Sequence, residues 1–220
     1  MSEESLIRQP MLLELYDQFL ADEDSAAFIH RVGLRYSQAT LLRLIAHPHR
    51  LVRRGTVLAL GYVGDYESNA ALGRALNDLD RGVRMLAENG IRTVWCRAGS
   101  EAQRREISAI ISLNTTKRHQ EALRRVQHFT REAPWFAEGW NQTAIALYCL
   151  NEFDDSIAAC REALEINPYH FGAAAGMGQC YLKLGERSLS LEAFRRALKL
   201  NPNLEGVRAN VVYLERLLEK

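Results

Sequence analysis

Hydrophobic residues recur at helical spacing along almost the whole chain. Near the start, Leu12, Leu13, Tyr16, Phe19 and Leu20 fall on one face of a helix. Similar segments of about 10–15 residues follow one another, separated by short breaks rich in glycine or proline. No segment keeps the two-residue alternation of a strand. The pattern predicts an all-α protein of about thirteen helices joined by short turns.

The prolines reveal an internal repeat in the second half of the chain. Pro134, Pro168 and Pro202 are spaced by 34 residues. Residues 162–168 (Glu-Ala-Leu-Glu-Ile-Asn-Pro) align with residues 196–202 (Arg-Ala-Leu-Lys-Leu-Asn-Pro). Each proline ends a helix, because it lacks the N–H donor and clashes with the preceding turn. A fixed period of this length is typical of stacked helical hairpins that share a core.

This part of the chain resembles the tetratricopeptide repeat (TPR) family, whose unit is a 34-residue helix–turn–helix. The resemblance implies units near residues 103–136, 137–170 and 171–204, and a capping helix at 205–219. It also implies small residues where two helices approach closely: Ala144, Ser156 and Ala163, and then Gly178, Ser190 and Ala197. Large residues would fill the spaces between hairpins: Trp140, Leu147, Tyr181 and Phe194.

The first and last segments of this region differ from the pattern. The first unit carries Glu106 at the aromatic position and the bulky Ile110 and Phe129 at small positions. After Pro202, residues 205–219 form one more amphipathic helix. A solenoid needs a polar outer face on its last element, and we expect this helix to supply it.

A second repeat lies upstream. Residues 51–54 (Leu-Val-Arg-Arg) recur as residues 82–85 (Gly-Val-Arg-Met), 31 positions later, after an acidic turn. This region resembles short HEAT repeats of the phycobilin-lyase type. The resemblance implies that the arginines of the Val-Arg pairs, Arg53 and Arg84, meet acidic turn residues such as Asp65, Asp78 or Asp80 and tie successive repeats together.

Together these patterns predict one continuous right-handed α-solenoid of stacked helical hairpins. Residues 1–24 would form an N-terminal helical cap, residues 25–100 HEAT-like repeats, and residues 101–220 TPR-like repeats with their capping helix. Only the short segment 97–100 (Arg-Ala-Gly-Ser) separates the two kinds of repeat. We therefore expect the helix at 101–113 to pack directly on the helix at 81–95.

Composition narrows the class of protein. Hydrophobic residues make up 47% and charged residues 25% of the chain, as in ordinary globular proteins, and the net charge is +1. Such a balance gives no bulk attraction to nucleic acid or to an anionic membrane. No apolar run approaches the roughly 18 residues of a membrane helix. The acidic residues 1–5 do not resemble a secretory signal, so we expect a cytoplasmic protein.

The chain offers little for catalysis, metals or cofactors. The four cysteines form no CxxC pair, and in a reducing compartment they are expected to be small buried residues. His47 and His49 flank Pro48, but no third ligand lies near them in sequence. The glycines of 172–178 fall inside a predicted helix, not in a phosphate-binding loop. We expect a non-enzymatic protein without metal or cofactor.

Arginines cluster in the HEAT-like part. Arg50, Arg53, Arg54, Arg81 and Arg84 include helical neighbours that could form a positive stripe. Such a stripe can hold DNA phosphates, so a nucleic-acid-binding module is one alternative function. The ion-pair ladder between repeats is the favoured interpretation of these arginines.

The TPR resemblance implies that first helices of hairpins line a concave groove. The expected partner-binding residues are Glu138, Asn141, Ile145, Tyr148, Gln179, Lys183 and Tyr213. Amides can hydrogen-bond a peptide backbone, and Ile145 and Tyr148 can bury an apolar side chain. We expect a protein–protein interaction adaptor that binds a partner peptide or helix. The alternatives are a solvated face without ligand, the nucleic-acid module, and a small-ligand or prosthetic-group lyase or chaperone by analogy of fold.

Overall fold

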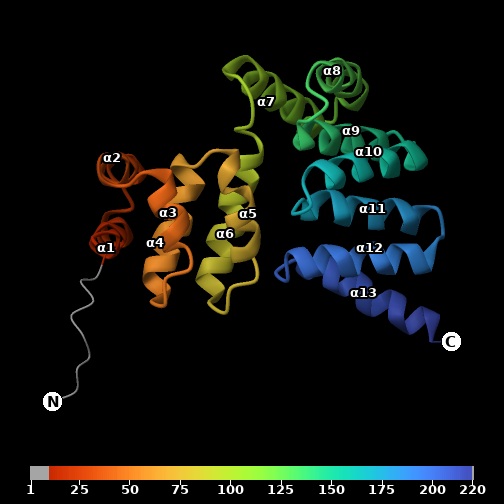
Figure 1. The fold of residues 1–220 in the computed structure, drawn as a ribbon. Coiled ribbons are helices and arrows are strands. Elements are labelled where there is room, and N and C mark those ends of the chain that lie inside the picture. Colours follow the sequence, from red (N-terminus) through yellow and green to blue (C-terminus); the bar gives the residue numbers. More distant parts are fainter. Residues whose placement is uncertain (1–9, 220) are drawn as a thin grey trace. The chain divides into compact units, whose positions relative to one another are not determined.

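The computed structural model describes residues 10–219 and confirms the all-α prediction (Figure 1). These residues form thirteen α-helices and one 3-10 helix, without a strand. In chain order the elements are α1 (Leu12–Asp22), α2 (Ser25–Arg35), α3 (Gln38–Leu44), α4 (Arg50–Val63), η1 (Tyr66–Ser68), α5 (Asn69–Ala75), α6 (Arg81–Trp95), α7 (Glu101–Thr115), α8 (His119–Glu132), α9 (Ala137–Cys149), α10 (Phe153–Ile166), α11 (Phe171–Lys183), α12 (Arg187–Leu200) and α13 (Glu205–Leu218). None of these helices combines the length and the apolar character needed to cross a membrane.

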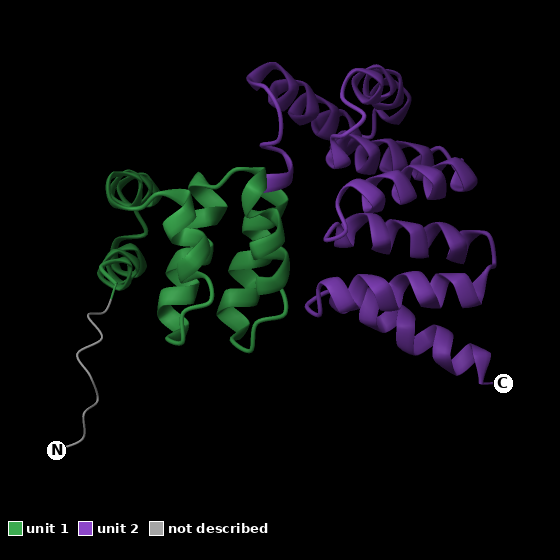
Figure 2. Ribbon diagram, in the orientation of Figure 1, with its two compact units in different colours: residues 1–93 green, residues 94–220 purple. Residues whose placement is uncertain are grey.

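The chain divides into two compact units (Figure 2). The first unit ends at Thr93 and the second begins at Val94. The boundary therefore falls inside α6, whose last two residues belong to the second unit, and not in the expected segment 97–100.

In the first unit, α4 is the helix on which the others pack. It contacts α1, α2 and α3. Its backbone also comes into direct contact with that of α6, where Gly61 and Gly90 meet. A Cβ built on Gly61 would lie 3.0 Å from the Cα of Gly90, which leaves no room for a side chain at this crossing.

In the second unit, helical hairpins follow one another with the predicted 34-residue period. The hairpins α9/α10 and α11/α12 repeat the same contact at their centre. Ser156 Oγ donates to the carbonyl of Ala144 at 2.8 Å, and Ser190 Oγ donates to the carbonyl of Gly178 at 2.8 Å. All four residues are buried. Small residues at these positions therefore let the second helix approach the backbone of the first, as predicted.

The Asn-Pro pairs end the second helices with a repeated turn. The side chain of Asn167 accepts from the backbone N–H of Tyr169 at 3.1 Å, and that of Asn201 accepts from Asn203 at 3.0 Å. An asparagine that bonds to its own backbone two residues further on fixes a tight turn. This contact explains why asparagine accompanies proline in both repeats.

The last helix does not have the polar outer face expected of a cap. Val211 and Leu214 of α13 pack against Leu191 and Phe194 of α12. On its other side, Val212 is 42% exposed and Tyr213 is 56% exposed. The amphipathic pattern of this segment identified a helix, but its apolar residues cover more of the surface than one contact with α12 buries.

Two glycines of α11 should respond oppositely to alanine. A Cβ on Gly178 would lie 2.5 Å from the ring of Phe194, which is fully buried, whereas a Cβ on Gly176 would make only an ordinary contact with Cys160 at 3.5 Å. Alanine gains about 1 kcal/mol of helix propensity at either site, but overpacking costs about 1–3 kcal/mol. We expect Gly176→Ala to raise the urea midpoint and Gly178→Ala to lower it. Equal shifts would contradict the close approach at Gly178.

Candidate functional site

The first helices of two hairpins share a face in the second unit. Helices α9 and α11 contact each other, and a Cβ on Gly172 of α11 would lie 3.9 Å from Oδ1 of Asn141 on α9. On this face, Asn141 and Gln179 are half-buried, and Ile145 is 38% exposed. We call the row formed by Asn141, Ile145 and Gln179 the inner row.

The other expected groove residues are placed differently. Tyr148 is half-buried, with its ring edge-on to Phe153 at 5.6 Å between centroids. Burial raises the pKa of the Tyr148 phenol, so this residue is neutral in the physiological range. Lys183 and Tyr213 are exposed, at the end of α11 and on α13. None of these three residues makes a printed polar contact that would remove it from a partner.

Glu138 is a correction to the predicted groove. Its side chain is buried, not presented to a partner, and its carboxylate accepts three hydrogen bonds. His170 Nε2 lies 3.0 Å from Oε2, and Oε1 accepts from Asn141 Nδ2 at 3.0 Å and from Gln142 Nε2 at 2.7 Å. Burial alone would raise the pKa of Glu138, but the hydrogen bonds, that of His170 first, hold it below its usual range.

His170 is fixed on all sides. Its Nδ1 accepts from the backbone N–H of Ala173 at 3.1 Å and caps the start of α11, so Nε2 carries the proton that is donated to Glu138. The ring stacks on Trp95 at 4.1 Å between centroids, with an interplanar angle of 18°. Sequence reasoning missed this role, although a polar residue directly before a predicted helix start at 171 is the position of an N-cap.

Gln142 extends this buried network to α7. Asn114 Nδ2 donates to the backbone carbonyl of Gln142 at 3.0 Å and to its Oε1 at 2.9 Å. Near the network, burial and the charge of Glu138 raise the pKa of the Cys96 thiol to about 12. Cys96 is therefore an unreactive thiol at neutral pH. The described residues contain no group of three or more His, Cys, Asp or Glu side chains that could hold a metal ion.

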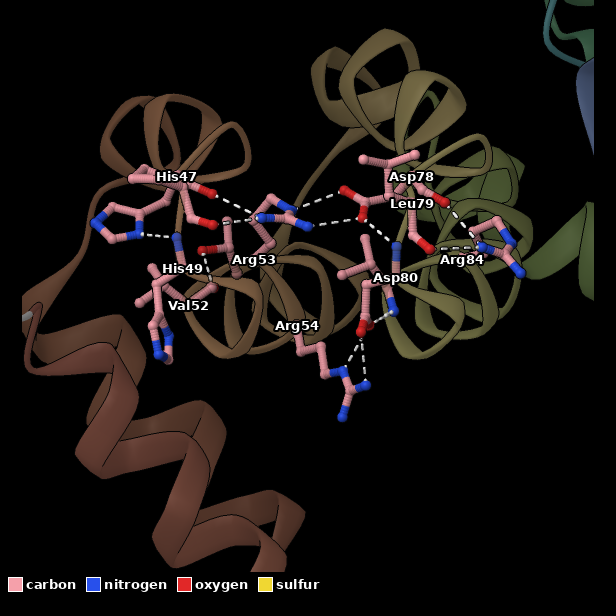
Figure 3. Close-up of polar contacts among 12 residues, drawn as sticks. His47, His49, Val52, Arg53, Arg54, Asp78, Leu79, Asp80 and Arg84 are labelled. Atoms are coloured by element: carbon pink, nitrogen blue, oxygen red, sulfur yellow. Dashed lines mark hydrogen bonds and ion pairs between the residues drawn. The ribbon is translucent and has the colours of Figure 1, made fainter.

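The arginines of the first unit form the predicted ladder (Figure 3). Arg53 donates from Nε and Nη2 to the carboxylate of Asp78 at 2.8 and 2.9 Å, and from Nη1 to the carbonyls of His47 and Pro48. Thirty-one residues later, Arg84 Nη1 donates in the same way to the carbonyls of Asp78 and Leu79. The expected Arg53–Asp78 contact is confirmed.

Arg54 and Asp80 form a second bidentate pair, at 2.7 and 2.8 Å. The hydrogen bond from Arg54 is the main reason that the pKa of Asp80 falls to about 2. Asp80 Oδ1 also accepts from the backbone N–H of Val83 at the start of α6. Two arginines of the possible phosphate-binding stripe are thus already bound to carboxylates, and Asp65 instead accepts from Gln38.

Comparison with known proteins places repeats where the 34-residue period predicts them. Residues 137–170 and 172–204 match the family model "Tetratricopeptide repeat", so this part of the chain consists of TPR repeats. The match does not include the expected unit at 103–136, where α7 and α8 lie. The HEAT-like character of residues 25–100 stays a prediction.

Curated relatives match about half of the chain. A TPR repeat-containing protein of Rhizobium etli is 29% identical over 114 residues, which are 52% of this chain and 56% of that protein. The small glutamine-rich tetratricopeptide repeat-containing protein of Dictyostelium discoideum is 35% identical over 104 residues, 46% of this chain and 30% of that protein. The chain therefore spans between a third and somewhat over half of these relatives.

Among solved structures, the first TPR of Spaghetti (RPAP3), bound to the HSP90 peptide SRMEEVD, has a similar fold. Its TM-score is 0.50 at 16% sequence identity, over 52% of this chain and 91% of that chain. At this identity the likeness concerns the fold of the helical hairpins.

Replacing Asp80 with asparagine should separate its charge from its capping role. Because the pKa of Asp80 is lowered from 3.8 to about 2 by folding, its carboxylate stabilises the fold above pH 3.8, and this contribution disappears as the pH falls towards 2. Asparagine keeps the N-cap. We expect Asp80→Asn to lower stability by about 1–2 kcal/mol at pH 7 and to show a smaller loss on acidification than the parent.

Urea unfolding at pH 7, 4 and 2.5 measures this effect. Glu101→Gln is the matched control, because the Glu101–Arg105 pair is exposed at 80% and 73% and contributes little. Parallel acid curves for Asp80→Asn and the parent protein would show that the Arg54–Asp80 pair does not stabilise the first unit.

Replacing Glu138 with glutamine should destabilise the second unit. A glutamine amide offers one oxygen and one NH₂ group to a site where three donors converge, so at least one donor is left without an acceptor. We expect a loss of about 2–3 kcal/mol by urea or thermal unfolding. Glu165→Gln, on the exposed face of α10, should be neutral. A Glu138→Gln protein as stable as the parent would exclude the buried network.

Proposed function

We propose that this chain is a non-enzymatic protein-interaction adaptor that binds a partner peptide or helix on the inner row of α9 and α11. The observation that supports the proposal is the inner row itself. Its side chains are half-buried or exposed, while the small residues on the opposite side of the same helices are packed inside the hairpins. This row is available for a partner without unpacking the repeats.

The buried carboxylate of Glu138 orients the inner row. Because Asn141 Nδ2 donates to Glu138, Asn141 Oδ1 is the amide atom left to accept a hydrogen bond from a partner backbone. An amide fixed before binding loses less entropy than a freely rotating one. Glu138 is thus a positioning residue for the site, in place of the contact residue that the sequence predicted.

The chemistry of the inner row favours an apolar partner. Its three side chains carry no charge, whereas the second helices α10 and α12 expose charged residues: Arg161, Glu162, Glu165, Glu192, Arg195 and Arg196. Lys183 is the basic residue among those expected to line the groove. We therefore propose that a partner inserts an apolar side chain beside Ile145 and pairs its backbone with the amides, with affinity that depends little on salt.

The comparisons support an adaptor at the level of class. TPR repeats occupy residues 137–204, and a TPR of similar fold holds a peptide in its structure. That peptide, SRMEEVD, carries two glutamates and an aspartate. The neutral inner row argues that the partner of this chain differs from such an acidic tail.

Placing a charge on the inner row should prevent partner capture without unfolding the protein. We expect Ile145→Glu to lose specific partners in an affinity pull-down read by quantitative mass spectrometry, because a carboxylate beside the apolar contact must be desolvated. Ala158→Glu, on the exposed face of α10, is the matched control and should keep them. Both variants should melt like the parent. If Ile145→Glu retained the same partners, the inner row would not be the binding surface.

A further inference from the structure

The last helix leaves an apolar face uncovered. A shallow hollow on α13 is lined by Glu205, Arg208, Ala209, Val212, Tyr213 and Arg216. Ala209, Val212 and Tyr213 form its exposed apolar centre, and Glu205 and Arg216 stand at its two ends. We call this surface the α13 face.

The 34-residue register identifies what kind of element fits the α13 face. Val212 stands 34 residues after Gly178 and 68 after Ala144. At both earlier positions, the second helix of the hairpin lies on the first, and a serine hydroxyl reaches the backbone carbonyl. In a helical hairpin the two helices run antiparallel. The α13 face is therefore the seat of an antiparallel helix, and at Val212 this seat is open.

We propose that the α13 face of a second copy of this chain occupies the seat, so that two copies form a dimer through antiparallel α13 helices. Glu205, Ala209, Val212 and Arg216 follow one another at intervals of four, three and four residues, the spacing of a helix-pairing seam. Under a two-fold axis, Glu205 lies opposite the partner's Arg216, and Ala209 lies opposite the partner's Val212. The stripe is complementary to itself only in this direction, since a parallel pair would place like charges together.

The neighbouring residues agree with the same register. Arg208 lies opposite the partner's Tyr213, where a guanidinium can stack on the exposed ring. Glu215 takes no part, because it is paired with Arg195 of its own chain at 2.7 Å. The symmetry makes each of these contacts twice. One pair of three-to-four-turn helices buries less than the roughly 1,200 Å² of stable complexes, so the dimer dissociates on dilution.

Charge exchange on the α13 face tests the proposal. Sedimentation velocity from about 1 to 500 μM should show a monomer–dimer equilibrium for the parent protein, within the range of weak complexes. Glu205→Arg and Arg216→Glu should each weaken the dimer at least tenfold at low salt, because each places like charges at both ends of the seam. Val212→Glu should be monomeric. Ala158→Glu, on α10, should dimerise like the parent, and all variants should keep the parent's circular dichroism and melting curve.

Mixing the two charge variants is the decisive arm. A heterodimer of the Glu205→Arg chain with the Arg216→Glu chain places opposite charges at both ends, so the mixture should dimerise although neither variant does so alone. The double variant Glu205→Arg/Arg216→Glu should also recover the dimer. A parent protein that stays monomeric throughout the concentration range, or a mixture that stays monomeric, overturns the proposal and leaves the face to a helix of another protein. The inner-row experiment measures other residues, so either result stands without the other.

Discussion

The close approach of two helices at a small residue is the contact on which the second unit depends. At Ala144 and Gly178 the backbone of the first helix is near enough for a serine hydroxyl of the second to reach its carbonyl. A side chain of ordinary size there would separate the helices and open the core around Phe194. Because this approach uses one side of α9 and α11, their other side is left for recognition, and α13 is left with an unfilled seat.

The two units join their elements with different chemistry. In the first unit, bidentate arginine–carboxylate pairs and arginine–carbonyl contacts bridge successive turns. In the second, apolar burial dominates, and the buried polar groups are neutral amides around a single carboxylate. Partly buried ion pairs with lowered carboxyl pKa values respond to acid, whereas apolar seams do not. Low pH should therefore weaken the first unit before the second.

The sequence predicted what is periodic. The 34-residue spacing located both matched repeats, and the Val-Arg pairs predicted the Arg53–Asp78 contact, because equivalent positions in successive repeats share an environment. What could not be predicted depends on residues outside the repeat. Glu138 occupies a groove position by register, yet His170 and Gln142 enclose its carboxylate, and Trp95, 43 residues upstream, covers His170. Likewise, an amphipathic pattern indicates that α13 is a helix, but not how many of its faces find a partner.

The proposed partner surface and the proposed dimer surface meet at Tyr213. By register this residue continues the row of Ile145 and Gln179, which stand 68 and 34 residues before it, and it also lies on the α13 face. A ligand that reaches along the row to α13 would cover a ring that the dimer needs. Two events that require the same surface exclude each other, and the exclusion is reciprocal in free energy. If both surfaces are used, partner binding and self-association compete, and the weak dimer then holds the adaptor in reserve until a partner displaces it.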